Sequence, residues 1–410
     1  MVQKYDYVII GAGLSGLNTA YQILKKNKKC KICLIEKYNE IGGRIHSVYL
    51  HNNLKYEAGA IRFYPEHKNL LSLMKEFGLN SKNFITVPND YPRNNLFTKK
   101  SLNLKIKEKT LNKELLETKN INKFLSENMS LEDYALKVIG KSKLDYLKTI
   151  NGFQHIFKTS AVYGLYLLKR DFVDVKEFYI LKGSLTEFLY KILDNIQDNG
   201  CKLLTGEEFL SFKNLKNNDI EVKTSKNTYK TNNLILAIPY SNLNKIKKIP
   251  NELVNSVMPI PLCRIFSIYP NNNYWHNNLK STFSNNNIQR IFPTGTRLIQ
   301  ISYTSGDKAD FWGKLSKDKI KLKQELHKEL MELFPKKKID NPDLLNVHYW
   351  SEGIHLWNKD IESDSITDKI IKPLDDTNLY ICNEAYSKYQ RWMEGSVEMS
   401  NRVVNLIFDK

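Results

Sequence analysis

A glycine-rich turn near the start of the chain, Gly11-Ala12-Gly13-Leu14-Ser15-Gly16, constrains the fold more than any other feature. The run Tyr7–Ile10 before it predicts a short buried strand, and the apolar residues that follow recur at helical spacing. The first glycine permits the tight turn, the second lets the backbone approach a pyrophosphate, and the third lets helix and strand pack closely. The N–H groups at the helix start then face the phosphates. The sequence therefore predicts the strand, turn and helix of a dinucleotide-binding fold.

An acidic residue and a second pair of glycines sharpen this interpretation. Residues 31–35 predict a second strand, and Glu36 ends it at the position where a carboxylate accepts hydrogen bonds from an adenosine ribose. In the next loop, Gly42-Gly43-Arg44 offers close backbone approach and a guanidinium for a second phosphate contact. NAD dehydrogenases do not carry this step, whereas glycine-rich nucleotide flavoproteins do. We therefore interpret this part of the chain as a site for FAD.

The composition argues against several classes of protein. The 410 residues are enough for two domains, and no apolar run reaches the length of a membrane span. Asp6 and the glycines argue against a signal peptide, so we expect a cytoplasmic or intracellular protein without membrane association. The formal net charge of +18 is spread along the chain without an arginine-rich stripe, so we expect no nucleic-acid partner.

Cysteine and histidine residues are too scattered to predict a disulfide framework or a metal site. Cys30 and Cys33 have CxxC spacing, but no second pair accompanies them. The eight histidines show no HExxH or paired-ligand spacing. We therefore expect no bound metal.

The order of predicted elements indicates an α/β protein whose domains are interleaved in sequence. A strand-rich segment returns at about residues 202–238, far from the first half of the nucleotide site, and a last strand and helix follow at Leu379–Cys382 and Met393–Ile407. We expect a Rossmann-like FAD-binding domain, a mainly helical substrate subdomain and a mixed-sheet substrate domain. Their expected segments are 1–65, 180–240 and 370–410 for the first, 66–179 for the second and 241–369 for the third.

Several motifs together resemble the flavin-containing amine oxidase family, which includes monoamine, polyamine and L-amino-acid oxidases. The resemblance runs nearly end to end and implies a FAD-binding domain like that of glutathione reductase. Besides the two glycine motifs and Glu36, it rests on Tyr56–Phe63, Gly183-Ser184-Leu185, Leu236–Pro239, His348–Gly353, Tyr380–Glu384 and Trp392–Glu398.

The resemblance also implies contacts to the cofactor. Gly59–Arg62 would line the flavin ring, Glu384 would bond the ribityl chain, and the backbone of Phe209 would touch the adenine side. Residues Arg391–Ser396 would cover the pyrimidine end, where a helix N-terminus stabilises negative charge. The expected cofactor-binding residues are Gly11, Gly13, Leu14, Ser15, Gly16, Glu36, Lys37, Gly43, Arg44, Gly59, Ala60, Ile61, Arg62, Phe209, Glu384, Arg391, Trp392, Met393, Glu394, Gly395 and Ser396.

The chain departs from the family pattern at three positions that bear on the cofactor. Glu40 replaces a basic residue two positions before the paired glycines, Asn383 replaces a glycine before Glu384, and Ser400 replaces a glycine in the last helix. No cysteine lies in the loop where a covalent flavin link would form. We therefore expect FAD to be held non-covalently, with Arg44 neutralising the pyrophosphate.

The candidate catalytic residues are Arg62, Arg264, Trp392 and Tyr303. The segment around Arg62 is most similar to the L-amino-acid oxidases, where an arginine clamps the substrate carboxylate; a guanidinium fork suits that group. Trp392 matches an aromatic wall beside the flavin, and Tyr303 is a candidate substrate contact. Arg264 matches the lysine that many members place near flavin N5, but an arginine cannot serve as a base at neutral pH.

We therefore expect oxidation of the α-amine of an L-amino acid, with hydride passing to flavin N5. Hydrolysis of the imine gives a keto acid and ammonia, and O2 is reduced to H2O2. The expected partners are an amino acid or amine substrate and O2. The same motifs leave open a FAD-dependent amine or polyamine oxidase, a flavin isomerase or desaturase, and a catalytically degraded flavoprotein.

Overall fold

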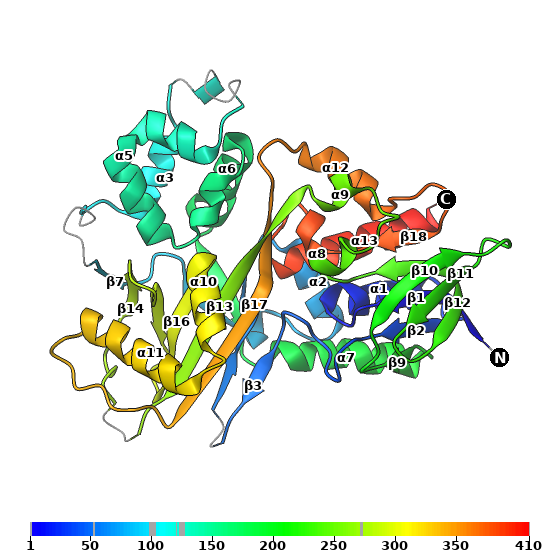
Figure 1. Ribbon diagram of the computed structural model, residues 1–410, viewed down its shortest axis with the longest axis horizontal. Helices are drawn as coiled ribbons and strands as arrows, with labels where there is room; N and C mark the ends of the chain where they lie inside the picture. Colours follow the sequence, from blue (N-terminus) through cyan, green and yellow to red (C-terminus); the bar gives the residue numbers. More distant parts are fainter. Residues whose placement is uncertain are drawn as a thin grey trace. The chain divides into compact units, whose positions relative to one another are not determined.

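The computed structural model describes residues 2–51, 54–97, 104–119, 121–122, 128–270 and 274–409, and these form two compact units. Unit 1 contains residues 1–87, 177–258 and 361–410, and unit 2 contains residues 88–176 and 259–360 (Figure 1). Each unit is assembled from separated segments of the chain, so the two are interleaved in sequence. Among the described residues, no helix has the length and apolarity needed to cross a bilayer.

Unit 1 is built on a seven-stranded sheet in the order β10-β11-β12-β1-β2-β9, with β18 also paired to β12. The central strand β1 pairs in parallel with β2 and β12, and β18 pairs in parallel with β12. Strands β10 and β11 extend the sheet in antiparallel fashion. The predicted Rossmann-like α/β fold is thereby confirmed. The strands are β1 (Gln3–Ile10), β2 (Ile32–Ile35), β9 (Lys202–Leu204), β10 (Phe209–Asn214), β11 (Ile220–Thr224), β12 (Thr228–Leu236) and β18 (Leu379–Ile381).

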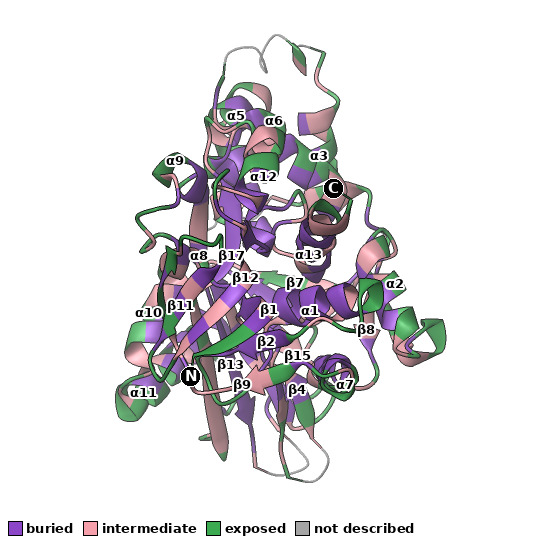
Figure 2. Cartoon of the chain, turned by 90° about the vertical axis from the view of Figure 1, so that its right-hand side faces the viewer, coloured by how far each residue is buried: buried purple, intermediate pink, exposed green. Residues whose placement is uncertain are grey.

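One helix packs on this sheet and two others pack on that helix, because each of the three carries apolar residues at helical spacing. Helix α1 (Leu14–Lys26) contacts both α7 (Leu185–Asp198) and α13 (Met393–Phe408). The side chain of Ser184 caps α7 by accepting a hydrogen bond from the N–H of Glu187 at 3.2 Å. Strand β2 is buried along its whole length, and most of α1 is buried (Figure 2). The α1–sheet contact therefore forms the centre of the unit.

Smaller elements complete unit 1. Strands β3 and β4 form a two-stranded ribbon, and β5, β8 and β6 form a three-stranded sheet. The helix α2 packs against α13, and α12 contacts α9 and β18. The bounds are β3 (Ser47–Tyr49), β4 (Lys55–Glu57), β5 (Arg62–Phe63), α2 (Lys68–Glu76), η1 (Ser81–Asn83), β6 (Phe84–Pro88), β8 (Glu177–Leu181), α8 (Tyr240–Leu243), α9 (Asn251–Val254), α12 (Ser363–Ile371) and η5 (Glu384–Tyr386).

Unit 2 is built on a six-stranded mixed sheet in the order β17-β13-β16-β15-β14-β7. Strand β16 pairs antiparallel with β13 and with β15, and β15 pairs antiparallel with β14, whereas β7 runs parallel to β14. The strands are β7 (Arg93–Leu96), β13 (Val257–Ile268), β14 (Ser281–Ser284), β15 (Arg290–Pro293), β16 (Leu298–Ser305) and β17 (Leu344–Trp357).

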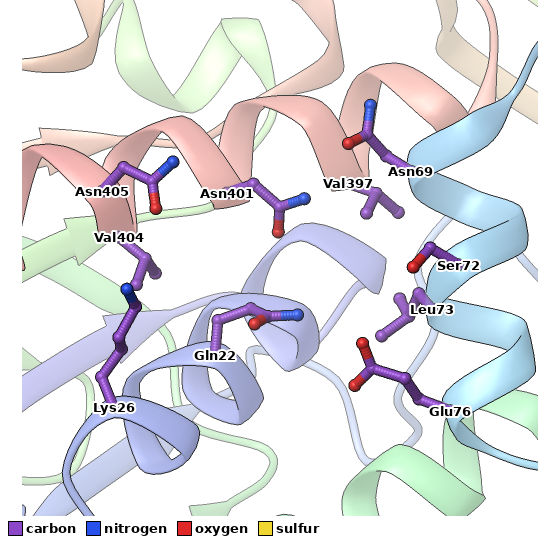
Figure 3. A pocket seen from close by; sticks show the side chains of 10 residues that line it. All are labelled: Gln22, Lys26, Asn69, Ser72, Leu73, Glu76, Val397, Asn401, Val404 and Asn405. Carbon is purple, nitrogen blue, oxygen red and sulfur yellow. The ribbon is translucent and has the colours of Figure 1, made fainter.

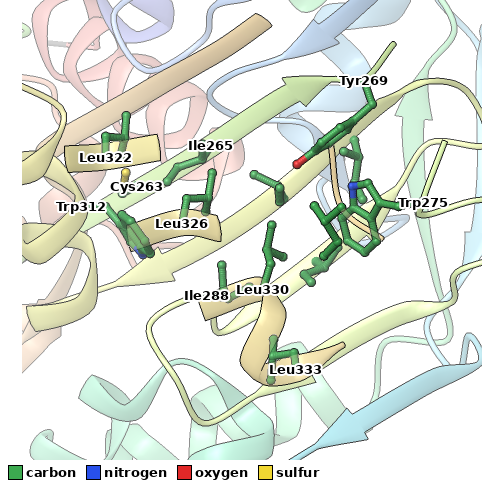
Figure 4. Packing of buried hydrophobic residues seen from close by; sticks show 14 of the residues in the cluster. Cys263, Ile265, Tyr269, Trp275, Ile288, Trp312, Leu322, Leu326, Leu330 and Leu333 are labelled. Atoms are coloured by element: carbon green, nitrogen blue, oxygen red, sulfur yellow. The ribbon is translucent and has the colours of Figure 1, made fainter. Parts of the chain in front are cut away.

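The core of unit 2 forms where helices α10 (Asp307–Leu315) and α11 (Lys319–Leu333) meet the sheet. Trp312 of α10 and Leu326 of α11 are buried against Ile265 and Ile301 of the strands (Figure 4). Burial of such apolar side chains contributes about 1.5–3 kcal/mol each. The other helical segments of the unit are α3 (Glu108–Leu116), α5 (Leu131–Asn151), η3 (Gln154–Lys158), α6 (Ala161–Leu168) and η4 (Lys169–Val173).

The unit boundaries differ from the predicted domains. Residues 88–176 of the predicted helical part and 259–360 of the predicted sheet part share unit 2, where β7 of the former pairs with β14 of the latter. The remaining residues of the predicted sheet part, 241–258 and 361–369, belong to unit 1. Residues 66–87 belong to unit 1 because α2 packs on α13 and β6 joins the sheet of β5 and β8. These pairings join segments far apart in sequence, which hydrophobic periodicity alone does not report.

The structure gives a reason for the serine at position 400, where the family pattern has a glycine. The side-chain amide of Asn18 on α1 is fully buried and donates to Ser400 Oγ of α13 at 2.6 Å and to Asn401 Oδ1 at 3.0 Å. Ser400 also donates to a backbone carbonyl of its own helix. The α1–α13 contact is therefore joined by a buried polar pair, and a glycine at position 400 would leave Asn18 without this acceptor.

We expect Asn18→Ala to lower the free energy of unfolding by about 1–3 kcal/mol, because it leaves the buried Ser400 hydroxyl and Asn401 amide without their partner. Chemical unfolding followed by circular dichroism measures this change. Because the two residues touch, Ser400→Ala combined with Asn18→Ala is expected to cost less than the sum of the single changes. Additive costs would contradict the proposed coupling.

Candidate functional site

The glycine turn is fixed by backbone contacts that admit no side chain. Gly11 has a φ of +103°, and a Cβ added there would lie 2.4 Å from the carbonyl oxygen of Ala237. A Cβ on Gly16 would lie 1.9 Å from the carbonyl oxygen of Gly11. The end of β1, the start of α1 and the residue after β12 are thus pressed together. Only glycine fits at Gly11 and Gly16.

Gly13 and Gly43 both border open space, although Gly43 also has a φ of +61°, which itself favours glycine. Gly13 has φ −77°, which any residue adopts, and the nearest atom to an added Cβ is the Gly42 carbonyl oxygen at 3.8 Å. For Gly43 the nearest atom is the Cα of Gly13, at 4.0 Å. The protein therefore leaves open space beside these two glycines, at the N-terminus of α1. This cradle fits the pyrophosphate of a dinucleotide, which side chains would exclude.

Glu36 lies directly after β2, next to the glycine turn. Its Oε2 accepts the N–H of Ala12 at 2.8 Å, and its Oε1 accepts the N–H of Tyr38 at 3.1 Å. The side chain is thus oriented at the carboxyl end of β2, as ribose recognition requires. The Glu36 carbonyl accepts the N–H of Glu207 at 2.9 Å, so the loop after β9 borders this position.

Two further predicted cofactor-binding residues, Lys37 and Phe209, lie farther along these loops. The ammonium of Lys37 pairs with Glu208 at 2.9 Å, and that hydrogen bond raises the pKa of Lys37. Phe209 begins β10, the edge strand, where it pairs with Thr224. Sequence reasoning did not include Glu207, whose backbone reaches Glu36 directly.

The two ends of the chain meet in an ion pair. The guanidinium of Arg44 lies 2.7 Å from the carboxylate of Glu384, which is 3% exposed. Glu384 also accepts the N–H of Arg391, a non-glycine residue with a φ of +75°. A Cβ on Gly59 would lie 1.9 Å from the Arg44 carbonyl oxygen, so that glycine sets the position of the Arg44 loop. Ala60 and Ile61 then lead from this contact into β5.

Asn383 performs a local capping role at the position where a glycine was expected. Its amide donates to the carbonyl of Ile238 at 2.6 Å, and its Oδ1 accepts the N–H of Ala385 at 2.9 Å. These bonds hold the short 3-10 segment η5, and with it Glu384, against the end of β12. Asparagine in place of glycine at position 383 is therefore compatible with the ion pair between Arg44 and Glu384.

The start of α13 is anchored through Glu394. Its carboxylate accepts hydrogen bonds from the N–H groups of Asn69 and Leu70 at 3.1 and 2.8 Å and from the Asn69 amide at 2.7 Å. These groups lie at the N-terminus of α2, and burial raises the pKa of Glu394. The Glu394 side chain is thus directed at α2. The backbone of the first turn, with Met393, Gly395 and Ser396, remains as the predicted positive helix end.

Trp392 belongs to an aromatic cluster in unit 1. Its ring stacks on Phe178 with centroids 6.2 Å apart and meets Tyr64 and His67 edge-on, each at 5.0 Å. The guanidinium carbon of Arg62 lies 5.4 Å from the Phe178 ring centroid. The structure therefore brings Arg62 and Trp392 next to the same ring, that of Phe178. Sequence reasoning missed Tyr64, His67 and Phe178 because their contacts join three separate segments.

Arg264 and Tyr303 are brought together in unit 2. They are directly paired residues of the antiparallel strands β13 and β16, and the guanidinium carbon lies 4.6 Å from the tyrosine ring centroid. Arg264 is 7% exposed. Arg290 of β15, which sequence reasoning missed, lies 4.1 Å from the same ring.

Cys382, which directly follows β18, does not present a reactive thiol. Cys382 is fully buried and lies 3.4 Å from Thr19 Oγ1. Burial raises its pKa to about 12, which keeps the thiol protonated at neutral pH. Within the described ranges, no group of three His, Cys, Asp or Glu side chains is arranged to hold a metal ion.

A separate polar cavity of about 250 Å³ lies between α1, α2 and α13 of unit 1. Figure 3 shows Lys26 and Glu76 at opposite ends of it, with amide side chains between them. None of the predicted cofactor residues lines this cavity, so it is not the glycine cradle. Its lining residues are Gln22, Lys26, Asn69, Ser72, Leu73, Glu76, Val397, Asn401, Val404 and Asn405.

Comparison with known proteins finds a family profile that matches nearly the whole chain. The profile described as flavin containing amine oxidoreductase matches residues 14–407. Matches to individual curated proteins are short. Mitochondrial L-2-hydroxyglutarate dehydrogenase of Dictyostelium discoideum is 39% identical over 61 residues, and prenylcysteine oxidase 1 of Rattus norvegicus is 38% identical over 74 residues. These cover 14% and 18% of this chain and, in both cases, 14% of the relative.

Solved structures share the fold over its full length. Putrescine oxidase bound to putrescine has a TM-score of 0.74 at 14% identity, covering 99% of both chains. Cyclohexylamine oxidase from Brevibacterium oxydans IH-35A has a TM-score of 0.72 at 14% identity, covering 98% of both chains. At this identity the likeness establishes the fold.

We expect Gly13→Ala to affect cofactor binding and Gly16→Ala to affect folding. Gly13→Ala is expected to fold with nearly unchanged stability but to lose bound FAD, because its methyl group enters the open cradle. Gly16→Ala is expected not to fold, because its methyl group collides with backbone. The absorbance of bound flavin per chain and the thermal unfolding of each purified protein measure the two effects. A Gly13→Ala protein with full flavin content would contradict the cradle.

Proposed function

The chain belongs to the family of flavin-containing amine oxidoreductases, and on that premise we propose that it oxidises the α-amine of an L-amino acid. The net reaction consumes the amino acid, O2 and water and yields a keto acid, ammonium and H2O2. The family assignment makes the chain a flavin-dependent oxidoreductase with FAD as its cofactor. The choice of amino acid as substrate and of O2 as final acceptor is our proposal.

The observation that supports an amino acid is the position of Arg62. It directly follows the segment Gly59–Ile61, and its guanidinium lies over Phe178, which stacks on Trp392. A permanently charged planar fork beside an aromatic wall suits a substrate that carries a carboxylate next to its amine. Arg62 would hold the carboxylate, and Trp392 and Phe178 would restrict the orientation of the Cα–H bond.

The residues of unit 1 also fit the cofactor. We propose that the Gly13–Gly43 cradle holds the pyrophosphate, with Arg44 supplying charge, that Glu36 holds the adenosine ribose, and that the buried thiols leave the flavin non-covalent. When bound, the flavin would accept a hydride, which carries two electrons, from the substrate. The N-terminus of α13 would stabilise negative charge through its backbone N–H groups. The substrate amine must be neutral for hydride loss, which favours higher pH.

A second candidate is oxidation of an amine without a carboxylate. The similar fold of putrescine and cyclohexylamine oxidases supports this alternative. The two candidates differ in what Arg62 does: an amino acid needs the guanidinium, whereas a simple amine is repelled by its charge.

Anaerobic reduction of the purified flavoprotein tests the proposal. A panel of L-amino acids and of the amines left when their carboxylates are removed is mixed with the enzyme, and bleaching of the flavin absorbance is followed. We expect at least one L-amino acid to reduce the flavin faster than its matched amine, and to release H2O2 when air is admitted. Faster reduction by amines would favour the second candidate, and reduction by no compound would exclude both.

We expect Arg62→Ala to lower kcat/KM for the best L-amino acid by about 100-fold, because a charge-assisted contact to the carboxylate is lost. The matched amine is expected to lose nothing. Steady-state peroxide release measures both values. Arg402→Ala is the control, since Arg402 forms a surface pair with Asp368 on α13 and α12. An equal loss for amine and amino acid would contradict the carboxylate role.

A further inference from the structure

The polar cavity between α1, α2 and α13 shares no lining residue with the glycine cradle or with the proposed amino-acid site. Its volume of about 250 Å³ suits a molecule smaller than the drug-sized ligands that fill pockets of about 300–1,000 Å³. All of its lining residues belong to unit 1. Leu73, Val397 and Val404 supply buried apolar surface, and the other lining residues are polar or charged.

A fully buried asparagine next to the cavity fixes the orientation of two lining amides. Asn18 Nδ2 donates to Asn401 Oδ1 at 3.0 Å, and Asn18 Oδ1 accepts the side-chain amide of Gln22 at 3.3 Å. Each amide has one oxygen and one NH2 group. Asn401 therefore keeps its NH2 group as a donor for a further partner, and Gln22 keeps its oxygen as an acceptor. Their orientation is set before any ligand arrives, which reduces the entropy cost of binding.

The end of the cavity at α2 presents hydrogen-bond acceptors. The side-chain amide of Asn69 donates to the buried carboxylate of Glu394 at 2.7 Å, which leaves Asn69 Oδ1 as an acceptor. Glu76 accepts the hydroxyl of Tyr21 at 2.7 Å and the ammonium of Lys25 at 2.8 Å. Both bonds go to Oε2, so Oε1 takes part in neither. This end therefore suits a group with several N–H donors, such as an ammonium.

The opposite end of the cavity is positively charged. Figure 3 shows Lys26 there, across the cavity from Glu76, with Asn401 between them. Among the residues that the structure describes, no acid forms an ion pair with the Lys26 ammonium. This end therefore suits a carboxylate, which accepts hydrogen bonds from both ammonium and amide donors.

The unlike ends of the cavity select the kind of ligand. A molecule with an ammonium at one end and a carboxylate at the other finds suitable partners at both ends, whereas a singly charged molecule finds them at one end only. The apolar side chains between the ends favour an apolar chain between the two charges. An α-amino acid does not separate its charges in this way, because both are attached to one carbon.

We propose that this cavity binds a small zwitterion whose ammonium and carboxylate are separated by a short apolar chain, as in an ω-amino acid. The ammonium is held by Glu76 Oε1 and Asn69 Oδ1, and the carboxylate is held by Lys26 with the NH2 group of Asn401. The site uses none of the residues assigned to the flavin or to the amine substrate, so it does not rest on the proposed function.

Calorimetric titration of the flavin-loaded protein with 5-aminovalerate tests the site. The flavin is reduced beforehand and air is excluded, so that the probe cannot be oxidised during the titration. Pentanoate and pentylamine are the matched probes, because each keeps the chain and one of the two charges. We expect 5-aminovalerate to bind at one site per chain and at least about tenfold more tightly than either matched probe, because hydrogen bonds to charged groups form at both ends.

Two variants test the two ends separately. Lys26→Gln is expected to weaken the binding of 5-aminovalerate and pentanoate by about tenfold and to leave pentylamine binding unchanged, because it removes the charge at the carboxylate end. Glu76→Gln is expected to weaken the binding of 5-aminovalerate and pentylamine and to leave pentanoate binding unchanged. Both residues are exposed, so both variants are expected to fold.

Lys75→Gln is the control, because Lys75 is an exposed residue of α2 outside the cavity. It is expected to leave 5-aminovalerate binding unchanged, and so is Arg62→Ala, which alters the proposed amino-acid site. Absence of 5-aminovalerate binding, equally tight binding of a matched probe, unchanged binding by both cavity variants, or loss of binding in Arg62→Ala would overturn the proposal. None of these results depends on whether an amine reduces the flavin.

Discussion

The close contact between the backbones of Gly11, Gly16 and Ala237 is the constraint on which unit 1 depends. A Cβ at Gly16 would lie only 1.9 Å from the carbonyl oxygen of Gly11, which is a steric clash. The start of α1 can therefore approach β1 only because glycine is there. This approach places the N-terminus of α1 beside the open cradle at Gly13. It also positions α1 to receive α7 and α13. The proposed phosphate site and the packing of the last helix therefore share one steric cause.

Two buried carboxylates near the C-terminus connect distant parts of the chain to that framework. Glu384 pairs with Arg44, and Glu394 holds the N-terminus of α2. Removing Glu394 would leave the N–H of the buried Leu70 without its acceptor, which costs free energy. Removing Glu384 would take away the carboxylate that holds the partly exposed Arg44 guanidinium. Residues near the end of the sequence therefore help to hold the Arg44 loop and the start of α2, which lie near its beginning.

Stacking on aromatic rings orients arginines in both units. Arg62 lies over Phe178 in unit 1, and Arg264 and Arg290 lie over Tyr303 in unit 2. A ring fixes the long, flexible side chain through its face and does not use the hydrogen-bond donors in the guanidinium plane. The same physical contact therefore orients arginine side chains in both units and, at Arg62, supports the proposed amino-acid contact.

The sequence by itself determined the strand–turn–helix around Gly11, the acidic residue that ends β2, and the interleaved α/β fold, because each depends on local spacing. Tertiary structure decided the domain boundaries, since β7 and β14 pair across almost two hundred residues. It also decided that Glu394 caps α2 and that Arg290 joins Arg264 at one ring. Such contacts depend on which surfaces meet after folding, and periodicity along the chain carries no information about them.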